Sequence, residues 1–359
     1  MSATTISTAN RVKQWDDKAH VEYIRANRYK RYMGTDQNSI IQLMEDLTKK
    51  KGDAITCPLL GALDSSGGAN DGSSDLVGNE KALPNEGHQL TVEIVRDATL
   101  VNVDEEQASP INIRNAGKTA LKDLQMRYLR DDIDTALGSI AGVAYGSATE
   151  TNKDAWLATN SDRVLFGASQ SNNSGNDHSA SLLNVDATND KLTRDMVSEM
   201  RAMAQTAQTA NGDGLRPHTY GEDEETFVMF ADARSYRDLK ADMAAVLQDA
   251  EKRGKGNPLF TGTTSLYWDG VVIREMPNIA SLGAVGAASA TVSPIYLCGA
   301  QALGAAWAMR TKTTLRKEDD YGLKYGVGFM EMRKVDKILY GTGTAGKQWG
   351  VVTGYVASA

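Results

Sequence analysis

Large apolar residues recur every three or four positions between residues 109 and 142 of the 359-residue chain. They are Leu121, Leu124, Tyr128, Leu129, Ile133, Leu137 and Ile140, and this spacing places them on one face of a helix. Pro110 with Asn112 or Asn115 is a start signal, and Gly142 with Gly146 is a stop signal. A helix of about 25–28 residues would be roughly 40 Å long. We predict one long helix over Ser109–Gly142, around which the chain is organised.

Weaker patterns predict elements on both sides of this helix. Helices are expected at Trp15–Met33, at Ser39–Leu47, from Thr193 onward and over Tyr236–Ala250; strands are expected at Asp53–Leu60, around Leu90–Ile94, and at Thr226–Ala231, 270–277, Pro294–Cys298 and Gly350–Val356. Thr193 can cap the second helix, whose stripe of Leu192, Met196, Met200 and Met203 is typical of core packing. The stretch 146–180 is polar, and within it the run SQSNNSGNDHS (169–179) indicates an exposed loop.

A long polar segment separates the first two predicted strands. Residues 61–80 contain glycines and serines but no aromatic residue, so they offer little from which to build a core. A loop of this length in a compact domain usually indicates function or mobility. Asp64, Asp71 and Asp75 superficially suggest a calcium loop, but the alternate acidic spacing and the closing glutamate are missing.

Composition and charge narrow the class of protein. A hydrophobic fraction of 41% is enough for a sizeable core, and the formal net charge of −7 argues against a protein that reads nucleic-acid sequence through a basic surface. The two cysteines, Cys57 and Cys298, suggest neither a disulfide framework nor a zinc site. Without an apolar export signal at the N-terminus, we expect a soluble protein of a reducing cytoplasm.

The first 33 residues have the opposite charge balance. They contain seven Lys or Arg against three Asp or Glu, a net charge of +4. Such a segment is either a solvated helix face or an arm that reaches an acidic neighbouring subunit or nucleic acid.

Several motifs suggest ligand binding or catalysis, but the neighbouring residues that such sites require are missing. Residues 341–348, GTGTAGKQ, resemble a phosphate-binding loop, but Gln348 stands where Ser or Thr is needed and no helix follows, so we predict a glycine turn between two strands. The four histidines are His20, His88, His178 and His218, and the last three lie in polar, loop-like segments. Acidic runs such as 104–106 are contiguous and read as solvated. We assign no catalytic, cofactor-binding or metal-binding residue.

The order of parts is more informative than any motif. A polar arm, a hairpin with a long tip, a long helix and a mixed domain resemble the major capsid proteins of tailed bacteriophages with the Hong Kong 97-type fold. The chain resembles in particular the capsid-protein family named after the N-four podovirus. The resemblance is carried by 29–60, 75–83 (DLVGNEKAL), 121–142, 257–279, 297–307 (LCGAQALGAAW) and 350–356 (GVVTGYV).

The resemblance implies an α+β fold and an assignment of parts. Residues 1–50 would be the N-terminal arm, 51–105 the E-loop hairpin, 106–150 the P-domain with its spine helix, 151–302 mainly the A-domain, and 303–359 returning P-domain strands and the C-terminal strand. The implied function is a structural, non-enzymatic subunit that self-assembles as hexamers and pentamers into an icosahedral shell around double-stranded DNA. No cofactor is implied.

The resemblance also implies partners and places. They are other copies of the chain, a separate scaffolding protein, a portal protein and DNA held without sequence specificity, with no membrane; a decoration protein stays open. The chain would lie in the virion, and in the host cytoplasm during assembly. We expect the arm and the E-loop tip to clasp neighbouring subunits through Arg25, Arg28, Lys30, Arg31, Asp64, Asp71, Asp75 and Lys81.

Some relatives in this fold cross-link their shells through a lysine–asparagine isopeptide bond. Lys81 lies in the loop, but no matching acceptor or catalytic glutamate pattern accompanies it, so we expect no cross-links. Two other interpretations stay open: an encapsulin-like nanocompartment that holds protein cargo, and an oligomeric cytosolic enzyme with a carboxylate site.

Overall fold

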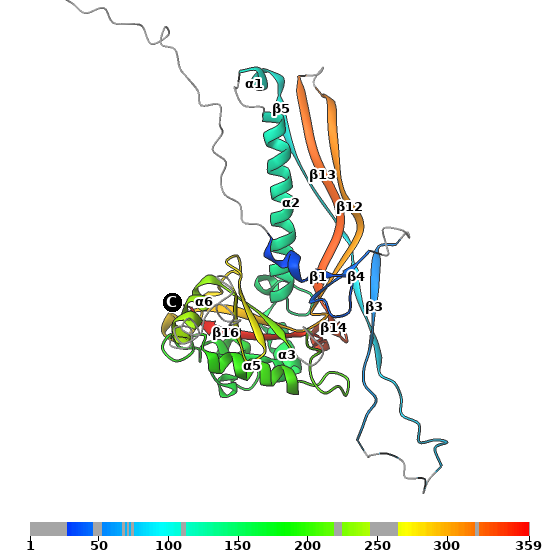
Figure 1. The fold of residues 1–359 in the computed structure, drawn as a ribbon, viewed down its shortest axis with the longest axis vertical. Helices are drawn as coiled ribbons and strands as arrows, with labels where there is room; N and C mark the ends of the chain where they lie inside the picture. Colours follow the sequence, from blue (N-terminus) through cyan, green and yellow to red (C-terminus); the bar gives the residue numbers. More distant parts are fainter. Residues whose placement is uncertain are drawn as a thin grey trace, which may run out of the picture. The chain divides into compact units, whose positions relative to one another are not determined.

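The computed structural model describes residues 27–45, 52–66, 69, 72, 75–108, 113–218, 225–244, 265–319 and 323–358. The chain divides into two compact units. Within the described residues, unit 1 comprises Ile94–Leu129 and Arg310–Met332 together with Asn27, and unit 2 comprises Arg28–Glu93, Arg130–Met309 and residues 333–358. Figure 1 shows the elements of both units.

A seven-stranded sheet forms the core of unit 2. Its strands are β6 (Val164–Phe166), β7 (Phe227–Ala231), β8 (Ser265–Trp268), β9 (Val271–Glu275), β10 (Gly283–Ala284), β11 (Thr291–Cys298) and β16 (Val351–Ala357). They lie in the order β6-β16-β11-β7-β9-β8, and β10 pairs with β11. β16 runs antiparallel to β11 and parallel to β6, so the last strand of the chain is an interior strand of this sheet.

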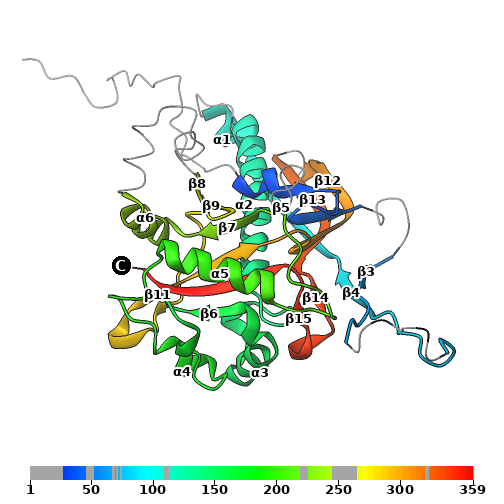
Figure 2. The ribbon, with the colours of Figure 1, turned by 60° about the horizontal axis from the view of Figure 1, so that its bottom comes forward.

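Helices cover both faces of this sheet, which explains why its strands are apolar almost throughout. On one face, α5 (Arg194–Thr206) buries Met196 and Met200 against Val352 and Val356 of β16. On the other face, α3 (Glu150–Asn160) and α4 (His178–Leu182) pack against Phe166 and other strand residues. Figure 2 shows α5 across the sheet and α3 with α4 beneath it.

Side-chain caps fix where the helices of unit 2 begin. The side chains of Thr149, Thr193 and Asp232 accept hydrogen bonds from backbone N–H groups in the first turns of α3, α5 and α6 (Ala233–Asp242) respectively. The predicted cap at Thr193 and the predicted methionine-rich core stripe are therefore confirmed. The expected strands at Thr226–Ala231, 270–277, Pro294–Cys298 and Gly350–Val356 are also present.

Unit 2 contains three smaller pairings. β3 (Ala54–Leu60) and β4 (Asn85–Thr91) form an antiparallel hairpin, and β14 (Leu339–Tyr340) pairs with β15 (Lys347–Gln348) across the predicted glycine turn. β1 (Met33–Gly34) and β2 (Ile41–Met44) are parallel, and β2 also pairs in parallel with Leu303–Ala306 of β12 (Leu303–Asp319).

Unit 1 joins helix and sheet through a small apolar core. It contains α1 (Val103–Ala108), the first part of α2 (Ile113–Gly138), and most of β5 (Glu93–Asn102) with segments of β12 and β13 (Lys324–Lys337). Leu121 of α2 packs with Val327 and Phe329 of β13. The hydroxyl of Tyr128 donates a hydrogen bond of 2.8 Å to Asp97 of β5, which ties the helix to the sheet within this unit.

The long helix ends earlier than its sequence signals suggest. α2 stops at Gly138 because Ala141 and Gly142, with φ of 54° and 79°, form a tight turn in which Ile140 and Val143 exchange backbone hydrogen bonds. The expected helix start at Pro110 lies outside the described residues. Two apolar residues of the predicted stripe, Ile133 and Leu137, are fully buried.

Several expectations are wrong. Residues 41–44 are strand β2 and not a helix, because Ile40 and Ile41 are buried through pairing with distant β12. The run 169–179 is exposed or partly exposed as expected, except that His178 is buried and begins α4. The partner of β3 begins at Asn85, and Ile94 belongs to the separate strand β5. Of the helix expected at Trp15–Met33, the described part is a 3-10 helix at Arg28–Tyr32 followed by β1, and the remainder lies outside the described residues.

No helix among the described residues is both long and apolar enough to cross a membrane.

His178 lies inside a group of aromatic rings. Its ring centroid is 5.5 Å from that of Tyr355 and 5.7 Å from those of Tyr145 and Phe166. Neither imidazole nitrogen has a hydrogen-bond partner among the described residues. Burial lowers the pKa of His178 from 6.5 to about 4, so the ring is neutral in the folded protein at pH 7.

We predict that His178→Phe removes part of the acid sensitivity of the fold. Below pH 6.5 the unfolded chain takes up a proton at His178 before the folded chain does, so stability is lost as the pH falls from 6.5 towards 4. The loss is about 3 kcal/mol in the free energy of unfolding. Urea unfolding between pH 7 and pH 4 measures it; identical pH slopes for the wild type and the variant would contradict the assignment.

Candidate functional site

Along the paired strands of the β3–β4 hairpin, one face is covered and the other is exposed. Ala54 pairs with Thr91 and Leu60 with Asn85, so the strands are in register over their whole length. Alternate side chains of β3 are buried and exposed, as a strand with one covered face requires. Beyond Leu60 and before Asn85 this cover ends, and every described residue from 62 to 83 is exposed.

A backbone contact holds the neck of the hairpin to the rest of unit 2. The N–H of Ala62 donates to the carbonyl of Ala210 at 3.0 Å, and the N–H of Gly61 donates to the carbonyl of Pro84 at 2.8 Å. A Cβ at Gly61 would lie 2.6 Å from the Cβ of Ala210, so only glycine permits this approach. The neck therefore fixes the direction in which the tip leaves the body of the unit.

Hydrogen bonds within the tip organise its two strands locally. Asp64 accepts from the N–H and the hydroxyl of Ser66, and these bonds lower the pKa of the Asp64 carboxyl. Lys81 donates to the carbonyl of Asp64 at 2.6 Å, which ties the outgoing chain to the returning chain. On the returning side, Glu80 accepts from the N–H of Gly78 at 2.8 Å.

The tip also exposes large apolar side chains. The exposed fraction reaches 87% for Val77 and 66% for Leu76, which are adjacent. The full set in and beside the tip is Leu60, Leu63, Leu76, Val77 and Leu83. We call these five residues the tip cluster. Large apolar side chains left exposed along one polar loop are typical of a surface that becomes covered on association.

The start of the described chain is anchored to unit 2. Tyr29 and Tyr32 are buried and meet Phe230 edge-on, with ring centroids 5.1 Å and 5.3 Å apart. Arg274 donates a hydrogen bond of 2.8 Å to the hydroxyl of Tyr32. Arg28 donates to the backbone carbonyl of Glu275 at 2.8 Å. The start of the described chain is therefore anchored through Arg28, Tyr29 and Tyr32.

The structure brings together only part of the proposed contact set. Asp64 and Lys81 meet in the tip, while Arg28 pairs with Glu275 of its own unit. Lys30, Arg31 and Asp75 are exposed, and Arg25 and Asp71 lie outside the described residues. The predicted contact residues were chosen by their charge, so the tip cluster was not among them. The apolar pair Leu76–Val77 between polar residues is a sequence signal that could have indicated it.

The motifs set aside in the sequence take structural roles. Residues 341–346 are a turn between β14 and β15, with positive φ at Gly341 and Gly343. Lys347 lies 3.7 Å from the carboxylate of Asp162 and donates to the carbonyl of Gln208. Within the described ranges, no group of three or more His, Cys, Asp or Glu side chains is placed to hold a metal ion.

The whole chain is similar to solved phage capsid structures. The capsid asymmetric unit of Cyanophage Pam1 is 33% identical with a TM-score of 0.88, and 100% of each chain is covered. The capsid of Ralstonia phage GP4 is 19% identical with a TM-score of 0.73, covering 100% of this chain and 99% of that one. The acidic stable capsid of Helicobacter pylori bacteriophage KHP30 is 12% identical with a TM-score of 0.69, covering 98% and 96%. No curated protein matches.

These likenesses confirm the expected fold class, the α+β fold of Hong Kong 97-like phage capsid proteins. The model of the phage capsid protein family matches residues 3–359, and the chain belongs to this family. It is a phage major capsid protein, a structural subunit that associates with copies of itself in the icosahedral shell of the virion.

We predict that Gly61→Ala destabilises the neck of the hairpin. The added methyl group would lie 2.8 Å from the carbonyl oxygen of Ala210, and relieving this overlap costs about 1–3 kcal/mol. Gly146→Ala is the matched control, because nothing lies within 4 Å of a Cβ there and its φ is not positive. Thermal unfolding compares the two variants; equal melting temperatures would show that the neck is not a fixed contact.

Proposed function

We propose that the chain forms hexamers and pentamers that close into a shell around double-stranded DNA, and that it belongs to the N-four podovirus group of Hong Kong 97-type capsid proteins. The observation that carries this proposal is the end-to-end likeness to the Cyanophage Pam1 capsid at 33% identity, together with the family match over residues 3–359. A shell of this kind is held by area summed over many symmetric contacts, and no single residue needs a special chemistry.

The proposed division into parts follows the resemblance. Residues 1–50 are the N-terminal arm, 51–105 the E-loop hairpin and 106–150 the P-domain with α2 as its spine helix. Residues 151–302 are mainly the A-domain, and 303–359 return to the P-domain and supply the C-terminal strand. The β3–β4 hairpin and the 26-residue helix α2 support the second and third of these assignments. Because β16 pairs with β6 and β11, we assign it to the A-domain sheet.

The proposed contacts between subunits combine the tip cluster with charged residues of the arm and the loop. The charged set is Arg25, Arg28, Lys30, Arg31, Asp64, Asp71, Asp75 and Lys81. Burying Leu76 and Val77 on a neighbour removes apolar surface from water, about 1.5–3 kcal/mol for each side chain. A loop that is ordered by its neighbour loses conformational entropy only on assembly, so the free subunit stays soluble.

The remaining partners are proposed from the same resemblance. They are a scaffolding protein, a portal protein and DNA packaged without sequence specificity; a decoration protein stays open. A net charge of −7 fits a shell that does not hold its DNA tightly. Assembly would take place in the host cytoplasm, and the chain would act as a building block and not as an enzyme.

We predict that placing charges on the tip cluster blocks assembly but leaves the subunit folded. The double variant Leu76→Asp with Val77→Asp changes two side chains that are 66% and 87% exposed, so its melting temperature stays within a few degrees of the wild type. Desolvating two carboxylates at an interface opposes association. Sedimentation and electron microscopy should show subunits or small oligomers where the wild type forms shells.

The control variant is Leu183→Asp. Leu183 is 61% exposed and follows α4, away from the hairpin in sequence, so the same chemical change there should leave shells intact. Normal shells from the double variant would show that the tip cluster is not an assembly contact. Loss of shells from both variants would show a general effect of added charge.

We also predict that mature particles contain no covalent links through Lys81. The Lys81 ammonium group bonds to backbone carbonyls of the same tip at 2.6 Å and 3.4 Å. Mature particles run on a denaturing gel should give a single band of subunit mass, and a ladder that disappears in Lys81→Gln would contradict this. The diameter and DNA content of the same particles distinguish a phage head from a nanocompartment with protein cargo.

A further inference from the structure

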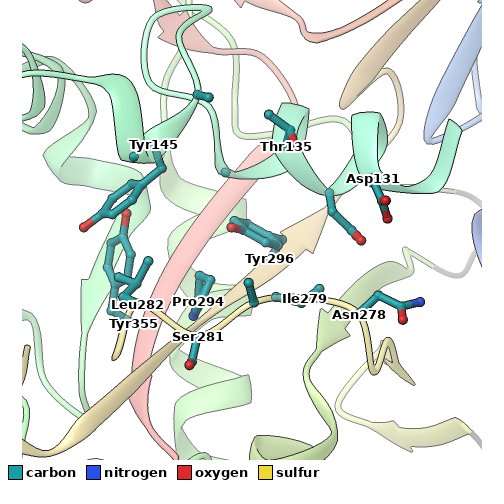
Figure 3. Close-up of a pocket in the computed structure, with 15 residues that line it drawn as sticks. Asp131, Thr135, Tyr145, Asn278, Ile279, Ser281, Leu282, Pro294, Tyr296 and Tyr355 are labelled. Atoms are coloured by element: carbon teal, nitrogen blue, oxygen red, sulfur yellow. The ribbon is translucent and has the colours of Figure 1, made fainter. Parts of the chain in front are cut away.

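A cavity of about 530 Å³ that is open to solvent lies within unit 2, and some of its lining residues, such as Asp131 and Asn278, are exposed. It is lined by the last turns of α2, the residues after that helix, the segment 278–282 that follows β9, and residues of β11 and β16. Figure 3 shows Tyr296 in the middle, Asp131 with Asn278 towards one end, and Tyr145 with Tyr355 at the other. Its volume is that of a small-molecule site.

The lining has the chemistry of a site for a cation. Two carboxylates, those of Asp131 and Asp134, lie in it with three tyrosines, and none of its lining residues is Lys, Arg or His. Carboxylates accept hydrogen bonds from ammonium or guanidinium groups, and tyrosine rings offer apolar surface to a hydrocarbon chain. The ring of Tyr145 already has the ammonium group of Lys153 4.5 Å from its centroid.

The negative charge of Asp134 is incompletely compensated. The Tyr29 hydroxyl donates to its Oδ1, while Oδ2 is buried and has no hydrogen-bond partner among the described residues. Asp131 differs, because Arg130 donates to its Oδ1 at 2.8 Å and more than half of its side-chain surface is exposed. A buried carboxylate with a free acceptor atom costs free energy unless a donor reaches it.

The helix end adds to the negative potential. α2 ends at Gly138, which lines the cavity, and the carbonyl groups of a helix C-terminus favour a nearby cation. Lys337 already donates to the carbonyl of Ser139 at 3.1 Å, beside the end of the helix. Lys337 is not part of the lining and does not compensate the charge of Asp134.

The raised pKa of Asp134 is a further sign that its negative charge lacks a partner. Burial raises the pKa of the Asp134 carboxyl to about 6. The charged or titratable groups that face it are Tyr29 from the 3-10 helix, and Arg130 and Asp131 from α2. Tyr296 of β11 faces it as well. A cation in the cavity would stabilise the ionised carboxylate.

We propose that this cavity binds an aliphatic cation, with its ammonium or guanidinium group at Asp134 and its hydrocarbon part against the tyrosine rings and Ile279. Free cations of this chemical class are the polyamines.

The first test measures binding of spermidine and n-butylamine to the full-length subunit by calorimetry, with n-butanol as the neutral control. The amines should bind about tenfold more tightly than the alcohol at pH 7. Asp134→Asn should weaken amine binding about tenfold, because its amide oxygen can still accept from Tyr29 while the charge is lost. Asp123→Asn, on the same helix but outside the lining, should leave binding unchanged.

The pH dependence gives an independent readout that needs no variant. Amine affinity should fall about tenfold between pH 7 and pH 5, as Asp134 takes up a proton. Equal affinity for amine and alcohol, or a pH-independent affinity, would overturn the proposal. Equal losses in Asp134→Asn and Asp123→Asn would also overturn it.

Discussion

The exposed apolar tip of the β3–β4 hairpin is the constraint on which the account depends. The tip has too few neighbours within its own unit to remove Leu76 and Val77 from water. Leaving them exposed forgoes roughly 1.5–3 kcal/mol for each side chain, and this free energy is recovered only when another surface covers them. The free subunit therefore contains part of the driving force for its own association.

The rest of unit 2 gives this tip a firm base. The seven-stranded sheet is covered on both faces, so its strands have little freedom to shift. The neck is attached to this body by the backbone contact between Ala62 and Ala210. The start of the described chain is attached by Tyr29 and Tyr32 on Phe230. The neck of the hairpin and residues 28–32 are thus both anchored to the body of unit 2.

Local patterns predicted the elements whose stabilising contacts lie close in sequence. The capped helix α5 has its cap and its apolar stripe within 15 residues, Leu192 to Thr206, and both were readable. Strand β2 was mistaken for a helix because its partner, β12, lies about 260 residues away. Helix α3 was missed because its polar sequence buries only Trp156, Leu157 and Asn160. The pairing of β2 with so distant a strand leaves no signal in the local sequence.

The candidate contact surface was predicted in outline only. Composition identified the loop, since residues 61–80 cannot form a core. Charge alone selected Asp64 and Lys81, and within the tip the Lys81 ammonium group donates to the backbone carbonyl of Asp64. The cavity beside α2 was invisible in the sequence, because Asp134, Asn278 and Tyr355 are brought together only by the fold.

Electron cryomicroscopy of particles assembled from the full-length protein tests the central claim most directly. The account predicts closed icosahedral shells in which Leu76 and Val77 of each subunit lie buried against a neighbouring subunit. Shells in which these two side chains face solvent would contradict it, because the hairpin tip would then contribute nothing to holding the subunits together.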